Sequence, residues 1–244
     1  METPGSIRRW LAVLLMPWIF AMACGSAAHA VEFSKVVIDA GHGGNDKGAS
    51  RDGVLESHLT LRVAERLEEE LKKRGLKTAM TRRSDVYIAL GSRVEIANRH
   101  ESSIFVSIHF NSHPRSVHRG VETYYGGPAS LPLARAIQKR MVERLKTDNR
   151  GVKQRLDFKV LRETKSPAVL LECGFISHPI ERRLSKTEVY QKVLVQAISD
   201  GIMAVHEKPA PKQWIVSRLT SRTYDALLGW GRHRIDELQR HFRP

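Results

Sequence analysis

Cysteine is scarce in this chain, which has only 2 among its 244 residues. That number excludes a small scaffold held together by several disulfides. Acidic residues are also few relative to basic ones, because 26 Asp and Glu stand against 40 Lys and Arg, for a formal net charge of +14. No low-complexity tract dominates and 41% of the residues are hydrophobic, which excludes a wholly disordered chain. The composition predicts a basic globular protein with a full hydrophobic core.

Long apolar runs are absent except near the N-terminus, where residues 10–23 are apolar apart from Pro17. Arg8 and Arg9 precede this run, and Ala28-His29-Ala30 follows it. A positive segment, a short apolar segment and an A-x-A site are the three parts of a secretory signal peptide. The run is shorter than the ~20 residues that span a bilayer, which argues against a transmembrane helix. We therefore expect a signal peptide over 1–30 and a mature chain in the periplasm or cell envelope.

The export route stays open between three alternatives. Residues 8–11 resemble a twin-arginine signal and residues 21–24 resemble a lipoprotein box, so these two routes stand beside general secretion. Cleavage after Ala30 would remove Cys24 and leave Cys173 as the only thiol. An intramolecular disulfide is then excluded, and we expect Cys173 to be buried and structural.

Hydrophobic periodicity predicts strands that alternate with helices along the body of the chain. The predicted strands are 35–40, 76–81, 103–110, 120–125 and 168–172, and the predicted helices are 59–75, 93–100, 131–145 and 188–206. This alternation is typical of an α/β fold. We expect a three-layer sandwich in which helices on both faces cover a mainly parallel twisted sheet, within a catalytic domain over 31–207.

Residues 208–244 differ in composition from the body of the chain and form a predicted basic C-terminal tail. The tail has eight Lys and Arg and three acids, a net charge of +5, and it carries Trp214 and Trp230. One interpretation is a helix that lies on an anionic envelope surface. The alternative is a segment that packs on the catalytic body or stays loose. We expect truncation near Lys208 to separate the two.

Two histidines and two glutamates lie at the ends of predicted strands or in the loop between them. These residues are His42 in A-G-H-G-G, Glu56 in G-V-L-E, His109 in S-I-H-F-N and Glu172 in V-L-L-E-C-G-F. Two imidazoles and one carboxylate with an open position suit a catalytic zinc, and a further glutamate suits a base for its bound water. A histidine in a glycine-rich turn is more often structural, but parallel strands deliver their ends to one edge, which favours a common site.

These motifs together resemble the zinc-dependent N-acetylmuramoyl-L-alanine amidases of bacterial cell-wall remodelling. The resemblance rests on V-V-I-D-A-G-H-G-G, S-I-H-F-N-S, G-V-E-T-Y-Y, F-K-V-L-R and P-A-V-L-L-E-C-G-F-I-S-H-P, in that order, over residues 35–206. It implies that one Zn²⁺ is held by His42, Glu56 and His109 and that Glu172 is the catalytic glutamate. It also implies hydrolysis of the amide between N-acetylmuramic acid and L-alanine in peptidoglycan, for wall remodelling or daughter-cell separation.

The sequence departs from the family pattern at positions that carry neither ligand nor base. Phe110 stands where the family often has Ala, and Thr60 and His178 stand where it often has Asn. Only about ten residues separate Asn111 from Val121, whereas some members insert an inhibitory helix there. We therefore expect an open site.

Two other functions stay open beside the amidase. One is an exported zinc hydrolase of another amide or peptide, and the other is a catalytically silent cell-wall binding module. The sequence pI of about 10.1 would suit nucleic-acid binding, but the predicted export argues against it. We expect a monomer whose partner is peptidoglycan, with no nucleic acid bound.

Five further residues have alternative roles. Asn111 either orients His109 or makes a turn, and Glu122 faces either solvent or the site edge. Cys173 should face away from Glu172 because neighbouring strand residues point to opposite faces. Arg155 and Arg162 could meet substrate carboxylates.

Overall fold

The structure is a computed structural model that describes residues 33–206. The predicted signal peptide and basic tail lie outside the described residues, so both stay predictions. Within the described range, no helix combines the length and apolar character needed to cross a membrane.

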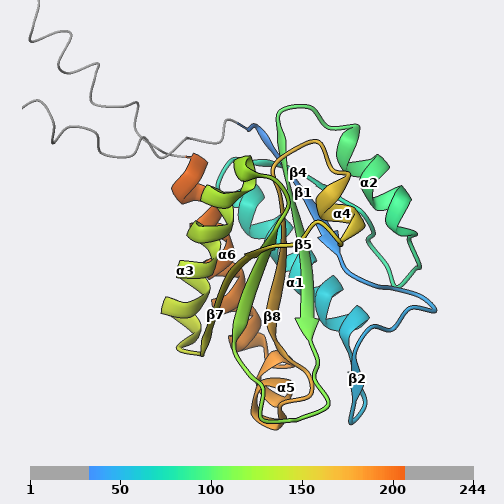
Figure 1. Ribbon diagram of the computed structural model, residues 1–244, viewed down its shortest axis with the longest axis vertical. Helices are drawn as coiled ribbons and strands as arrows, with labels where there is room; N and C mark the ends of the chain where they lie inside the picture. The colour runs from blue at the N-terminus through green and yellow to red at the C-terminus, as the bar shows by residue number, and fades with distance from the viewer. Residues whose placement is uncertain (1–32, 207–244) are drawn as a thin grey trace, which may run out of the picture. The chain divides into compact units, whose positions relative to one another are not determined.

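A six-stranded sheet in the order β4-β1-β5-β8-β6-β7 forms the middle layer (Figure 1). Its strands are β1 (Lys35–Ala40), β4 (Lys77–Met80), β5 (Ser103–Asn111), β6 (Val121–Tyr125), β7 (Asn149–Gln154) and β8 (Ala168–Phe175). Every neighbouring pair is parallel except β6 and β8, which are antiparallel. A separate two-stranded hairpin consists of β2 (Ser50–Arg51) and β3 (Val54–Leu55). The predicted mainly parallel sheet is confirmed.

Helices cover both faces of the sheet, which confirms the predicted three-layer α/β architecture. One face carries α1, α3 and α6, and the other carries α2 and α4 (Figure 1). The helices are α1 (Glu56–Lys73), α2 (Leu90–Asn98), α3 (Leu131–Leu145), α4 (Lys159–Arg162), α5 (Pro179–Ser185) and α6 (Glu188–His206), with a 3-10 turn, η2 (Pro128–Ser130).

The two faces of the sheet differ in polarity because strand side chains alternate. On β1, Val36 and Ile38 belong to the large core under α1, α3 and α6, whereas Val37 belongs to a smaller core under α2 and α4. Buried Asp39 and Ser107 share this second face. Polar residues are thus placed on the thinner side of the sheet, where a site can form without breaking the main core.

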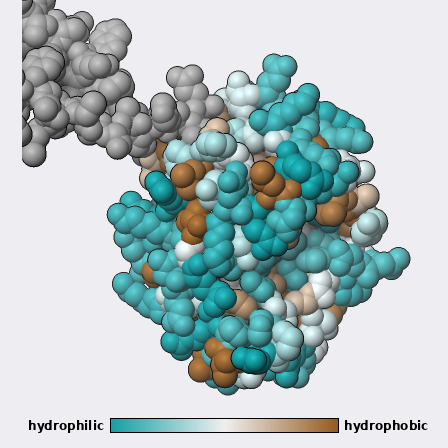
Figure 2. All heavy atoms as spheres, in the orientation of Figure 1, coloured by the Kyte–Doolittle hydropathy of each residue, from teal (hydrophilic) through white to brown (hydrophobic). Residues whose placement is uncertain are grey.

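The surface seen from the same direction is mostly hydrophilic (Figure 2). Hydrophobic residues gather there only in small, separate groups. This view therefore offers no extended apolar face. The polar residues of the candidate site lie instead at the ends of the central strands.

Several elements were absent from the sequence-based prediction, among them α4, which has only 4 residues. The β2–β3 hairpin is very short, and β7 has the sequence N-R-G-V-K-Q, which lacks an apolar pattern. The helix α5 has only 7 residues. The position of Glu56 also differs from the prediction, because it is the first residue of α1 rather than part of the preceding loop. The N-cap residue Leu55 makes no side-chain cap, so the sequence has no helix-start signal there.

Candidate metal centre

A tight turn at the end of β1 presents His42. Its φ of 60° lies in the left-handed region, and Gly43 and Gly44 follow with φ of 128° and 59°. Glycine adopts such angles without steric cost, which allows the chain to turn sharply after the histidine. A Cβ on Gly41 would lie 2.4 Å from the His109 ring, so the two histidine-bearing segments can approach only because residue 41 lacks a side chain.

The carboxylate of Glu56 lies between the two imidazoles. Its Oε1 is 3.1 Å from His42 Nε2 and 3.0 Å from His109 Nδ1. The backbone N–H of Ala49 donates to the other oxygen, Oε2, over 2.7 Å. The β2–β3 hairpin thus leads the chain into α1 at the position where its first side chain reaches the histidines.

The donor set fits a zinc ion. The candidate ligand atoms of His42, Glu56 and His109 all lie within 4.8 Å of one another. Ligand distances of about 2.0–2.2 Å in a tetrahedral zinc site place donor atoms roughly 3.3 Å apart, close to the two nitrogen–oxygen separations seen here. The imidazole rings meet edge to face at 76°, so different ring edges converge on the shared carboxylate.

Electrostatics favour a cation among these three side chains. Burial lowers the pKa of His42, but Glu56 and Asp46 outweigh it and raise that pKa to about 9. Burial disfavours the Glu56 carboxylate, yet the two histidines hold its pKa well below the usual range. An environment that stabilises a proton on these side chains would also stabilise a metal ion beside the carboxylate.

Asp46 orients His42 through the ring nitrogen that faces away from Glu56. Its Oδ1 lies 2.8 Å from His42 Nδ1. A carboxylate on the second nitrogen fixes the tautomer of a ligating imidazole and raises its basicity. Sequence reasoning missed Asp46, although its place four residues after the histidine was visible.

Two buried arginines hold the backbone of the His42 turn. Arg82 donates to the carbonyl oxygens of Ala40 and Gly41, over 2.9 Å each. Arg93 donates to Ala40 O at 2.7 Å and to His42 O at 2.6 Å. Three consecutive carbonyls are thus satisfied by two guanidinium groups. Sequence reasoning missed both arginines.

The carboxylate of Asp39 partly balances these two buried cations. Arg93 Nη1 is 2.7 Å from Asp39 Oδ1, and the hydroxyl groups of Thr81 and Ser107 each donate to Asp39 over 2.7 Å. Burial raises the pKa of Asp39, but Arg93 and these hydroxyls lower it further than burial raises it. An acid within the apolar run of β1 was the sequence signal for such a buried partner.

Glu172 lies beside the ligand cluster on the neighbouring strand, directly opposite His109 in the β5–β8 register. Its Oε2 is buried and has no hydrogen-bond partner among residues 33–206. Burial raises the pKa of Glu172 to about 7, and the nearby Glu56 and Glu122 act in the same direction. A general base works best when its pKa is near the working pH, so Glu172 is suited to exchange protons.

A cavity of about 490 Å³ opens beside these groups, between the loop before α2 and the segment leading into α4. His42, His109 and Glu172 lie in its wall. The other lining residues are Asp39, Asp46, Tyr87, Ile88, Leu90, Arg93, Asp157, Phe158, Lys159, Val160 and Leu170. The cavity therefore joins the candidate ligands and base to space for a substrate.

The structure also places three further residues considered in the sequence analysis, Glu122, Asn111 and Cys173. Glu122 is buried opposite Glu172 in the β6–β8 register, so it faces the site side. Asn111 has the turn role, since its side chain accepts from the Ser112 N–H. Cys173 is a free, buried thiol in the large core, on the face opposite Glu172. No helix interrupts residues 112–120, as expected from their number.

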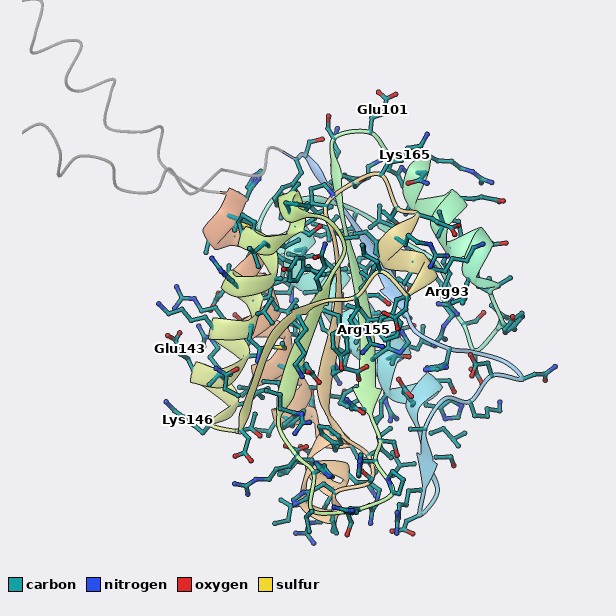
Figure 3. All side chains as sticks on the ribbon, viewed as in Figure 1. Arg93, Glu101, Glu143, Lys146, Arg155 and Lys165 are labelled. Atoms are coloured by element: carbon teal, nitrogen blue, oxygen red, sulfur yellow. The ribbon has the colours of Figure 1, made fainter. Side chains whose placement is uncertain are left out.

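The two arginines that we considered for substrate carboxylates are already paired. Arg155 forms two hydrogen bonds to Asp157, at 2.7 and 2.6 Å. Arg162 donates to Leu156 O and to Glu163. In Figure 3, Arg155 lies over the central strands and Arg93 lies to their right beside α2, while Glu101 and Lys165 lie at the top of the view.

Comparison with known proteins identifies the class. The family model described as N-acetylmuramoyl-L-alanine amidase matches residues 36–204. An N-acetylmuramoyl-L-alanine amidase from Clostridium difficile 630 is 34% identical, with a TM-score of 0.70 over 73% of this chain and 100% of that one. The catalytic domain of the amidase CwlV from Bacillus (Paenibacillus) polymyxa var. colistinus is 38% identical, with a TM-score of 0.67 over 70% of this chain and 97% of that one.

Of two similar curated relatives, one is named as a cell wall amidase. The "Uncharacterized protein YqiI" of Bacillus subtilis (strain 168) is 37% identical over 204 residues, which are 82% of this chain and 98% of the relative. The "Probable cell wall amidase LytH" of Staphylococcus aureus is 36% identical over 170 residues, 68% of this chain. The match spans 56% of LytH, so this chain covers only about half of that relative.

The α/β fold and the cluster of two histidines and a glutamate beside an unpaired acid are typical of a metal-dependent hydrolase. The chain belongs to the N-acetylmuramoyl-L-alanine amidase family.

Proposed function

We propose that this chain is a zinc-dependent hydrolase of peptidoglycan that cleaves the amide between N-acetylmuramic acid and L-alanine. The observation that carries the proposal is the convergence of His42, Glu56 and His109 within 4.8 Å, beside Glu172 and an accessible cavity. Family membership supplies the substrate class. Zn²⁺ is the metal that best suits two imidazoles and one carboxylate.

Zinc held by His42, Glu56 and His109 would supply a Lewis acid that polarises the scissile carbonyl and lowers the pKa of a bound water. The chain's own groups prepare that position. Asp46 orients His42, and the Ala49 and Phe110 backbone N–H groups donate to the Glu56 carboxylate, at 2.7 and 3.0 Å. These contacts hold the ligands in place before a metal arrives.

Glu172 accepts the proton of the attacking water and then delivers it to the departing amine of L-alanine. Its unpaired Oε2 leaves a lone pair for the incoming proton, and burial excludes competing solvent. A pKa of about 7 allows both the acceptance and the return of the proton near neutral pH. We therefore assign Glu172 as general base and then general acid.

The cellular setting proposed for this activity is the outer side of the cytoplasmic membrane, in the periplasm or cell envelope. Peptidoglycan lies there, and the proposed signal peptide over residues 1–30 would deliver the chain. N-terminal sequencing of the protein purified from whole cells tests this part of the proposal, because cleavage after Ala30 predicts Val31 as the first residue.

Two measurements test the proposed activity. Mass spectrometry of purified peptidoglycan treated with the protein should show free L-alanine N-termini on released peptides and glycan strands that keep their lactyl carboxylates. Elemental analysis of protein purified without added metal should show one zinc, and His109→Ala should lose it. A His109→Ala variant with a full equivalent of tightly bound zinc would refute the ligand set.

The product analysis also separates the competing functions. Cleavage of a different amide or peptide bond would favour the exported hydrolase of another substrate. Tight binding to peptidoglycan without any cleavage by the zinc-loaded protein would favour the silent binding module.

A further inference from the structure

A row of charged side chains crosses the sheet beyond Glu172. His109, Glu172 and Glu122 occupy successive register positions on β5, β8 and β6. On the next strand, β7, the register shift between Val121 and Thr123 of β6 places Arg150 and its neighbour opposite Glu122. The row therefore runs from a candidate metal ligand, through the proposed base, to the cations of an edge strand.

Two cations share the single carboxylate of Glu122. Lys153 forms an ion pair with its Oε1, and Arg150 Nε lies 3.8 Å from its Oε2. The hydroxyl of Tyr124 also donates to Oε2, at 2.8 Å. One acid cannot neutralise two cations, so one positive charge stays uncompensated in this group.

Arg150 is the cation that is held without a hydrogen bond. Its guanidinium lies 5.0 Å from the centre of the Phe175 ring, a cation–π contact that fixes its position. Its buried Nε has no hydrogen-bond partner among the described residues, while about a third of the side chain, 32%, is exposed. Arg155 and Arg119, by contrast, are each paired with an aspartate.

Other charges distinguish the two sides of the proposed base. Burial, together with the neighbouring side chains of His113, Arg150 and Arg115, lowers the pKa of His118, so basic side chains gather near Arg150. In the cavity on the other side of the base, the charged lining residues other than Glu172 and His109 are already paired, as Asp39 with Arg93, Asp46 with His42, Asp157 with Arg155 and Lys159 with Glu163. Arg150 on β7 therefore offers a substrate carboxylate a cation without a hydrogen-bond partner among the described residues, whereas the cations Arg93 and Lys159 in the cavity wall are already paired.

We propose that Arg150 is a specificity-determining residue that binds a free carboxylate on the stem peptide, at the residue that follows L-alanine. The inference rests on the proposed amidase function. Neighbouring strands are about 4.8 Å apart, so β7 lies roughly 10 Å from the β8 backbone at Glu172. An extended peptide advances about 3.4 Å per residue, so the second stem residue comes within reach of an arginine side chain. The sugar then occupies the cavity side.

The test uses two soluble substrates that differ in one group. N-acetylmuramyl-L-alanyl-D-glutamate γ-methylamide carries the free α-carboxylate, and N-acetylmuramyl-L-alanyl-D-isoglutamine γ-methylamide carries a neutral amide in its place. The zinc-loaded parent should cleave the acidic substrate with a kcat/KM about tenfold to a hundredfold higher, as expected for a charge-assisted hydrogen bond. Arg150→Gln should lose this preference through a higher KM for the acid and leave the amide substrate unchanged within about threefold.

Matched variants separate recognition from folding. Arg150→Lys keeps the charge and should keep part of the preference, whereas Arg119→Gln removes an exposed arginine already paired with Asp148 and should keep all of it. Binding of both substrates to the Glu172→Gln protein, measured by calorimetry, should show the same dependence on Arg150 without turnover.

Each other outcome has a defined meaning. Equal cleavage of both substrates by the parent, or an equal loss for both in a folded Arg150→Gln protein, would overturn the role of Arg150 and leave the amidase function standing. If the zinc-loaded parent cleaved neither these substrates nor polymeric peptidoglycan, the proposed function would fall and the inference with it.

Discussion

The β1 and β5 side of the site contrasts with the β8, β6 and β7 side in how its buried polar groups are paired. We call the first the metal half, defined by His42, Glu56 and His109 with Asp39, Arg82 and Arg93. There, hydrogen bonds link ligands, arginines and backbone carbonyls. The second, the open half, comprises Glu172, Glu122, Arg150 and Lys153. There, Glu172 Oε2 and Arg150 Nε are buried without a hydrogen-bond partner among the described residues.

This contrast relates pairing to function. A buried polar atom without a partner costs on the order of 1–3 kcal/mol, so folding alone does not favour such atoms. Complete pairing suits the metal half because ligand geometry must be fixed in advance. Incomplete pairing suits the open half because its groups must remain available to water and substrate. The predictions below test this division.

The largest effect is expected when the unpaired acid loses its charge. Glu172→Gln keeps the shape of the side chain but cannot accept a proton, so kcat should fall by about 10²–10⁴-fold while one zinc stays bound. Steady-state kinetics on the variant measures the fall in kcat, and elemental analysis of the same sample measures the bound zinc. Turnover near the parent rate would remove Glu172 from its proposed role, and loss of zinc would contradict the division into halves.

A smaller effect is expected from loosening the His42 turn. Arg93→Lys removes the fork that bonds Ala40 O, His42 O and Asp39 together, so zinc affinity should weaken by about tenfold to a hundredfold. Competition with a chelating dye measures the affinity, and the absorption spectrum of the cobalt-substituted protein should also change.

Arg74→Lys is the matched control for this experiment. Arg74 makes three side-chain hydrogen bonds, to Glu70, Asp200 and Gln196, but they join the helices α1 and α6. This variant should lower the melting temperature and leave zinc affinity and the cobalt spectrum unchanged. Equal losses of metal affinity in both variants would show that general destabilisation, not the turn, controls the site.

Substitution of two tightly packed glycines should have effects of similar magnitude. Gly41→Ala would place its Cβ 2.4 Å from the His109 ring, and Gly201→Ala would place its Cβ 2.5 Å from Ile137 Cα. Both should destabilise the fold by about 1–3 kcal/mol through overpacking. Only Gly41→Ala should also weaken zinc binding, because it displaces a ligand. Denaturant unfolding measures the stability of both variants, and competition with a chelator measures their zinc affinity. A loss of zinc affinity in Gly201→Ala as large as that in Gly41→Ala would contradict the prediction.

The smallest effect concerns the residue next to the proposed base. Cys173 faces the large core, so Cys173→Ala should cost about 1 kcal/mol of stability and leave kcat/KM within about twofold. Thermal unfolding and kinetics provide the check. A large loss of activity in a stable variant would mean that the thiol takes part in the chemistry.

The sequence predicted best those parts of the fold that carry a strong apolar pattern. The helices 131–145 and 188–206 have the predicted bounds, and the strands over 35–40 and 103–110 lie where expected. The edge strand β7 could not be predicted, because an exposed edge needs no apolar alternation and its pairing depends on β6. The start of α1 was misplaced because Leu55 supplies no capping side chain.

For the site too, the sequence predicted the residues that belong to motifs and missed those that act through tertiary contacts. Zinc-type donors and a glutamate could be named in advance from motif chemistry, and these four residues lie together. Arg82 and Arg93 act on backbone carbonyls across the fold, and such contacts leave no spacing signal. The position of Arg150 depends on a register shift between two strands, which sequence patterns do not encode.

The order of the site residues along the chain has a consequence for synthesis and folding. All three candidate ligands come from residues 42–109, and the strands β1 and β5, whose pairing helps to bring them together, both precede β8 in the chain. Glu172 joins only when β8 docks on the other edge of β5. Because a chain is made from its N-terminus, every donor for the metal emerges before the acid. The proposed metal ligands are thus encoded upstream of the proposed base.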